Sequence, residues 1–99
     1  MKITVDLNSS VPIYIQIEDS INSLIAAGQL QPGDQLPTIR ELAADIRVNL
    51  NTVAKAYHEL DLHGVISTQR GRGTFVSGAP DQEQIEKTRQ KLLQSIILT

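Results

Sequence analysis

Two arginines alternate with two glycines in the segment Arg70-Gly71-Arg72-Gly73, and this pattern suits contact with an anionic surface. Glycine tolerates positive φ, so a turn of this kind can bring its backbone close to another molecule. Guanidinium groups on an exposed tip fit a DNA minor groove, where the negative potential attracts them. We therefore expect Arg70 and Arg72 to contact nucleic acid rather than to be simply solvated.

A second polar group lies at the expected start of a helix, where Asn49, Asn51 and Thr52 follow one another closely. Short polar side chains and free N–H groups at such a position can meet phosphates or base edges. Asparagine can form two hydrogen bonds with adenine, so we expect Asn51 to read a base. We expect Asn49 mainly to cap the helix, and Lys55, one turn after Asn51, to meet a phosphate.

Other kinds of chemistry find little support in the sequence. His58 and His63 are the only histidines, and on a helix their spacing points them to different faces, so we expect no shared metal. The chain has no cysteine, and no nucleophile with an adjacent base can be assembled. The Gly-x-Gly of the arginine turn opens no helix, as a nucleotide-binding loop would. The sequence thus predicts no enzyme, no metal and no cofactor.

The composition is that of an ordinary globular protein with one domain of 99 residues, 40% of them hydrophobic and 20% charged. The sequence has no apolar run long enough to span a membrane and no signal-peptide layout, so we expect a cytoplasmic protein. The net charge of −2 argues mildly against a nucleic-acid partner. However, the stretch 38–74 gathers cations that could form a local basic face, namely Arg40, Arg47, Lys55, Arg70 and Arg72.

Apolar residues at helical spacing predict a first helix that begins near Ser10 and Pro12 and ends at Gly28. The segment 31–34 has proline and glycine at the central positions of a type II turn. The segment 3–7 alternates apolar and polar residues, which is compatible with an edge strand.

Two short helices should follow the turn at 31–34. Thr38 and Glu41 form a Thr-x-x-Glu capping box at the start of one helix, and Asn49 caps the next, which ends at Gly64. This is the layout of a helix-turn-helix. Residues 65–68 and 74–76 are predicted strands around a glycine-rich turn, which together make a wing. The predicted fold is mainly α with a small β-hairpin wing: a winged helix-turn-helix followed by a C-terminal helix.

At this point the sequence resembles the GntR family of bacterial regulators across residues 11–77. The blocks that carry the resemblance are Pro12-Ile13-Tyr14-x-Gln16-Ile17, Gly28-x-Leu30-x-Pro32-Gly33-Asp34-x-Leu36-Pro37, Arg40-Glu41-Leu42-Ala43, Asn51-Thr52-Val53 with Tyr57-x-x-Leu60, and Gly71-x-Gly73-Thr74-Phe75-Val76. The resemblance implies DNA contacts from the second helix, the first turn of the third helix and the wing tip. Pattern and resemblance together predict this DNA-binding set: Thr38, Arg40, Asn49, Leu50, Asn51, Thr52, Lys55, Arg70, Gly71, Arg72 and Thr74.

Within that family, the segment 49–57 resembles the small YtrA-type members, which lack a large effector domain and dimerise through C-terminal helices. Family members often place an arginine or proline where this chain has Leu50, and some place an arginine where it has Ala54. Because both of these base-reading arginines are missing, the operator sequence does not follow from the resemblance.

We divide the chain into an extension at 1–10, the winged domain at 11–78, and a linker with a C-terminal helix at 79–99. The chain stops without a C-cap, which is compatible with a longer natural protein. We expect the apolar stripes of the first three helices to cover one another, so that nothing before Gly78 offers a spare apolar surface. Dimerisation is therefore expected from one seam of the last helix: Ile85, Leu92, Leu93, Ile96 and Ile97.

The sequence thus predicts a sequence-specific regulator that binds double-stranded DNA as a homodimer on an inverted repeat. A repressor is favoured over an activator, since a small domain on a promoter can block polymerase without further parts. Two alternatives stay open: the amino-terminal fragment of a regulator fused to an aminotransferase-like domain, and a winged helix used for protein binding. The apolar Leu50 favours the second of these. No effector pocket is visible in the sequence.

Overall fold

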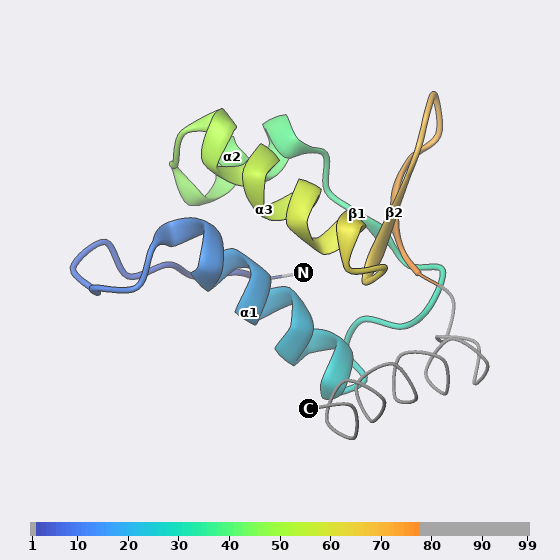
Figure 1. Ribbon diagram of the computed structural model, residues 1–99, viewed down its shortest axis with the longest axis horizontal. Helices are drawn as coiled ribbons and strands as arrows, with labels where there is room; N and C mark the ends of the chain where they lie inside the picture. Colours follow the sequence, from blue (N-terminus) through green and yellow to red (C-terminus); the bar gives the residue numbers. More distant parts are fainter. Residues whose placement is uncertain (1, 78–99) are drawn as a thin grey trace, which may run out of the picture.

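The computed structural model describes residues 2–77, which form three helices with a small antiparallel sheet at one end (Figure 1). This order confirms the predicted fold class, mainly α with a β-hairpin wing. The predicted helix after Asp81 and its apolar seam lie outside the described residues. The elements are α1 (Ile13–Ala26), β1 (Gln35–Leu36), α2 (Ile39–Ile46), α3 (Leu50–Leu62), β2 (Ile66–Gln69) and β3 (Gly73–Val76).

The first helix begins and ends at the predicted signals. Pro12 directly precedes α1, as its fixed φ allows, whereas Ser10 makes no cap. After the helix, Gly28 adopts a φ of 77°, and the N–H groups of Gln29 and Leu30 both donate to the carbonyl of Leu24. This left-handed glycine ends the helix by satisfying its last carbonyl groups.

The predicted type II turn then redirects the chain. The Asp34 N–H donates to the Gln31 carbonyl at 3.0 Å, and Gly33 has the positive φ of 89° that this turn requires. The turn delivers Gln35 and Leu36 to the sheet as β1, a strand that the sequence did not predict.

The sheet has three strands in the order β1-β3-β2, all antiparallel. The wing hairpin of β2 and β3 is in register from Ile66 opposite Val76 to Gln69 opposite Gly73. The expectation of an edge strand at 3–7 is wrong, because this segment pairs with no strand. Ile3 instead inserts into the core as irregular chain, while Leu7 is 72% exposed.

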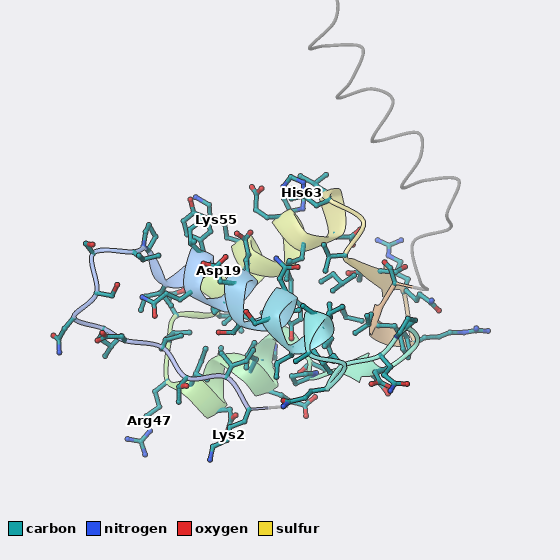
Figure 2. The ribbon with its side chains drawn as sticks, turned by 90° about the horizontal axis from the view of Figure 1, so that it is seen from below. Lys2, Asp19, Arg47, Lys55 and His63 are labelled. Carbon is teal, nitrogen blue, oxygen red and sulfur yellow. The ribbon has the colours of Figure 1, made fainter. Side chains whose placement is uncertain are left out.

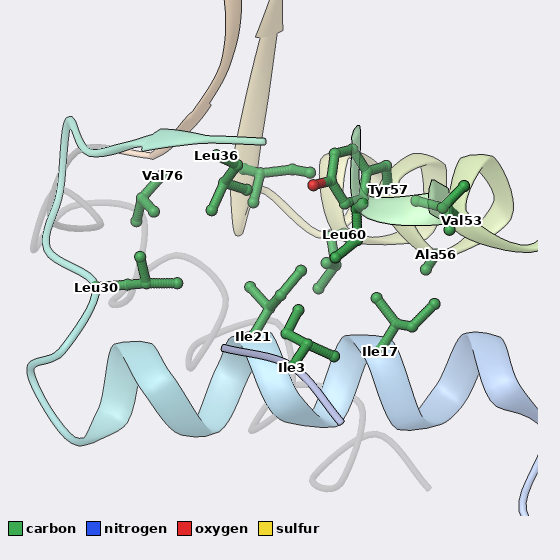
Figure 3. Close-up of a cluster of buried hydrophobic side chains, with 13 residues drawn as sticks. Ile3, Ile17, Ile21, Leu30, Leu36, Val53, Ala56, Tyr57, Leu60 and Val76 are labelled. Carbon is green, nitrogen blue, oxygen red and sulfur yellow. The ribbon is translucent and has the colours of Figure 1, made fainter. Parts of the chain in front are cut away.

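The core lies between α1, α3 and the sheet (Figure 3). Ile17 and Ile21 of α1 face Ala56 and Leu60 of α3 (Figure 3). Each of these side chains is at most 2% exposed, and close packing of this kind is the main stabilising contribution in a small domain. The core therefore packs against one side of α3 and leaves the other side of this helix exposed.

Two features contradict the expectation that no apolar surface remains before Gly78. Leu62 is 68% exposed at the end of α3. A hollow of about 250 Å³ is lined in part by Ile25, Pro32 and Val65. The described domain therefore offers some apolar surface of its own to a partner. Within residues 2–77, no helix is long and apolar enough to cross a bilayer.

Candidate nucleic-acid interface

The start of α3 is held by the residue that was expected to cap it. The Asn49 side-chain oxygen accepts a hydrogen bond of 2.7 Å from the Asn51 N–H, and the Asn49 carbonyl accepts from the Thr52 N–H at 3.0 Å. The side chain of Asn51 is exposed, whereas that of Thr52 is half-buried. Asn49 is thus occupied as a cap, and Asn51 presents its amide outward.

The buried side of α3 decides which residues face away from the protein. Val53, Ala56, Tyr57 and Leu60 are at most 3% exposed and form the core face. Residues on the opposite face of the helix are therefore available to a ligand. Leu50, Asn51, Lys55 and His58 are the exposed residues in the first two and a half turns.

Lys55 has an aromatic partner that the sequence did not predict. Its ammonium nitrogen lies 4.2 Å from the centre of the Tyr14 ring, close enough for a cation–π interaction. Because Tyr14 belongs to α1, no local spacing could have indicated this pair. Tyr14 therefore restrains the otherwise flexible side chain of Lys55 on α3. Figure 2 shows Lys55 and His63 along one side of the molecule and Arg47 on the opposite side.

Glu18, Glu59 and His63 form a small group of ionisable side chains within reach of the charge of Lys55. One carboxylate oxygen of Glu18 is hidden from solvent without a hydrogen-bond partner, although the side chain as a whole is only partly buried. Burial raises the pKa of this carboxyl, and the negative charge of Glu59 raises it further, with smaller opposing effects from His63 and Lys55. Glu59 is itself 3.9 Å from the imidazole of His63. Among residues 2–77, no three histidines or carboxylates form a group suited to a metal ion.

The start of α2 contains the predicted capping box. The Thr38 hydroxyl accepts from the Glu41 N–H at 3.0 Å, and the Glu41 carboxylate accepts from the Thr38 N–H at 3.2 Å. Arg40, between them in sequence, is exposed. Arg47 ends α2 in the left-handed conformation with a φ of 56°, a conformation more usual for glycine. Thr38 is therefore occupied by the cap, and Arg40 is free of it.

The wing places its arginines on the surface. Arg70, Gly71 and Arg72 are all exposed between β2 and β3, and Gly71 has a φ of 77°. The Arg72 N–H donates to the Gln69 carbonyl at 3.0 Å, which closes the turn. Both arginine side chains are thus carried on a tight, glycine-shaped tip.

The base of the wing differs from the sequence-based expectation. Thr74 is only 9% exposed and pairs with Leu36 on one side and Thr68 on the other, so its side chain belongs to the sheet and not to the outer surface. The Gln35 amide reaches the Arg72 carbonyl at 3.4 Å, and a Cβ at Gly73 would lie only 2.6 Å from that amide nitrogen. Gln35 therefore packs against the wing, a contact that depends on the unpredicted strand β1.

These exposed side chains are of kinds that bind a ligand through charge and hydrogen bonds. Cations stand on α2, α3 and the wing, and an amide that can donate and accept hydrogen bonds stands at the start of α3. Such a surface suits a polyanion whose backbone is held by charges and whose bases are read by polar groups.

Comparison with known proteins supports the same interpretation. The family model described as "Bacterial regulatory proteins, gntR family" matches residues 13–76. The chain is 52% identical over 75 residues to the HTH-type transcriptional repressor YtrA of Bacillus subtilis, a match that covers 76% of this chain. It spans 58% of the length of that relative.

Two solved structures extend the comparison. YtrA from Sulfolobus acidocaldarius, a GntR-family transcription factor, has 41% identity and a TM-score of 0.75, covering 98% of this chain and 82% of its own. The DNA-binding domain of AraR in complex with operator ORX1 has 30% identity and a TM-score of 0.68, covering 78% of this chain and 96% of its own. Sequence, fold and the placement of the polar groups agree, and the chain belongs to the GntR family of bacterial regulatory proteins.

Proposed function

We propose that this chain is a cytoplasmic transcription repressor that binds a specific sequence of double-stranded DNA. One observation carries the proposal: four cations are exposed on the helix-turn-helix and its wing. They are Arg40 on α2, Lys55 on α3, and Arg70 and Arg72 at the tip of the wing. The similar YtrA protein is named a repressor, and the similar AraR domain is in complex with an operator. Both facts favour DNA as the ligand and repression as the outcome.

The interface divides into groups that position the protein and groups that read sequence. Lys55 and Arg40 approach phosphates beside the major groove, while Arg70 and Arg72 enter or cross the adjacent minor groove. Asn51 reads a base edge from the start of α3. Thr38 and Asn49 act through the caps that they form. Thr74 is left out of the contact set because its side chain is buried.

The protein acts as a homodimer on an inverted repeat. One α3 and one wing read only a few base pairs, which gives little selectivity over the excess of competing sites in a genome. A two-fold dimer presents two copies of α3 to successive major grooves about 34–36 Å apart, or to a multiple of that spacing. The contact between the two subunits is made by apolar residues of the segment 79–99, namely Ile85, Leu92, Leu93, Ile96 and Ile97.

Selection from a pool of random duplexes tests this function. The full chain is incubated with the pool, and bound duplexes are separated by electrophoresis, amplified and sequenced over several rounds. The proposal predicts an enriched inverted repeat whose half-sites are one or more turns of about 10–10.5 base pairs apart. A chain that shifts no duplex and enriches no sequence would instead be a winged helix used for protein binding.

A further inference from the structure

Leu50 is the first residue of α3, and its side chain is 43% exposed. It is absent from the buried core and from the apolar side chains that pack against that core. A single exposed leucine is ordinary on a protein surface. This one is different because it stands next to Asn51, on the helix that is proposed to enter the major groove.

The helix places Leu50 in a pattern with its neighbours. Residues four apart lie one above the other on a helix, so Ala54 adjoins Leu50 and Lys55 adjoins Asn51. Ala54 is half-buried, and like Leu50 it is not among the side chains that pack on the core. The first two turns therefore carry a short apolar strip, made of the exposed Leu50 and the half-buried Ala54, beside the polar strip of Asn51 and Lys55.

This pattern selects among the groups that bases display in the major groove. Guanine is most often recognised there by arginine or lysine, and residues 50–54 contain neither. Adenine is recognised by asparagine, which Asn51 provides. The 5-methyl group of thymine is an apolar group on a base edge in this groove, and apolar side chains contact it.

We propose that Leu50 and Ala54 contact the 5-methyl group of a thymine, so that the start of α3 selects A·T base pairs through this apolar strip and Asn51 together. The proposal rests on the proposed function, since it concerns the same surface. It explains how a recognition helix without arginine at its start discriminates between sequences.

A double-mutant cycle between protein and DNA tests the contact. The probe is the duplex selected above, in which each thymine in turn is replaced by uracil, so that only the methyl group is removed. We expect one replacement in each half-site to weaken binding of the full chain about three- to fivefold, as expected for one buried methyl group. Leu50→Ala should reduce this thymine–uracil difference in affinity, because only Ala54 then contacts the methyl group.

Matched variants separate this contact from general damage. Leu62→Ala removes an exposed leucine from the far end of the same helix and should keep the full thymine–uracil difference. Asn51→Ala should weaken binding mainly through the loss of its contact with one adenine. It should also keep the thymine–uracil difference in affinity. Circular dichroism melting establishes that each variant is folded.

Three outcomes would overturn the inference. They are equal binding of uracil and thymine duplexes by the unaltered chain at every position, a thymine–uracil difference that Leu50→Ala leaves unchanged, and a selected half-site without thymine. If the chain selects no duplex at all, the proposed function fails first and takes this inference with it.

Discussion

The hydroxyl of Tyr57 donates a hydrogen bond of 2.7 Å to the carbonyl oxygen of Pro37. Tyr57 is only 3% exposed, and its burial raises the pKa of the phenol, with a further contribution from the negative charge of Glu41. The phenol is therefore a neutral donor throughout the physiological range. This bond joins α3 to the segment that begins α2, so it helps to fix the angle between the two helices of the helix-turn-helix.

Tyr57→Phe should lower the free energy of unfolding by about 1–3 kcal/mol, because it leaves the half-buried Pro37 carbonyl without its donor. Urea denaturation of the full chain measures this change. Tyr14→Phe is the matched control, since it keeps the ring beside Lys55 and should change stability by less than about 0.5 kcal/mol. Equal destabilisation of the two variants would show that the Tyr57–Pro37 bond has no special role.

Thr38→Ala should lower stability by about 1 kcal/mol, because the hydroxyl caps α2. Thr38→Ser keeps a hydroxyl and should restore most of that stability. Thermal melting and fluorescence anisotropy with the selected duplex separate stability from binding. If Thr38→Ala leaves stability unchanged and weakens binding, its hydroxyl is a phosphate ligand and not a cap.

The helix caps show which features could be predicted from the sequence. The cap at Thr38 and the cap at Asn49 join neighbours in the chain, and such short spacings are visible in a sequence. The same holds for the three helices and the wing, whose periodicity is local.

The missed features all depend on contacts between distant segments. The pairing of Gln35 and Leu36 with β3 creates a strand of two residues, too short to show any alternation. Thr74 was expected at the interface because of its place in a family motif, but it lies in the central strand, paired with Leu36 and Thr68, and is buried there. Lys55 was predicted as a cation, yet its Tyr14 partner follows only from the packing of α1 on α3.

Glu18→Gln should stabilise the protein at neutral pH. The pKa of this carboxyl is raised in the folded state, so proton binding to Glu18 stabilises the fold. This stabilisation is complete below the ordinary pKa of 4.5 and disappears as the pH rises through the folded-state pKa. The glutamine variant should therefore gain up to about 1 kcal/mol at pH 7, limited by solvent screening, and almost nothing at pH 4. Urea denaturation at both pH values tests this; a gain that is the same at pH 4 and pH 7 would contradict it.

Dimerisation should depend on the apolar seam of residues 79–99. Sedimentation velocity across a concentration series should show a weak dimer for the full chain, because about five apolar side chains per subunit make a small interface. Leu92→Glu and a chain that ends at Gly78 should both be monomers, whereas Gln94→Glu, off the seam, should still dimerise. A dimer that survives truncation at Gly78 would move the interface to the described domain, where Leu62 is exposed.

The salt dependence of DNA binding tests the central claim most directly. Anisotropy of the full chain with the selected duplex, measured over a range of KCl concentrations, should give a linear fall of the logarithm of the binding constant with the logarithm of salt. Arg70→Ala and Arg72→Ala should each make this slope shallower by about two units for the bound dimer, since each variant neutralises one phosphate fewer in each of the two subunits. A binding constant that does not change with salt, or slopes that neither arginine variant alters, would contradict the assignment of this surface to DNA.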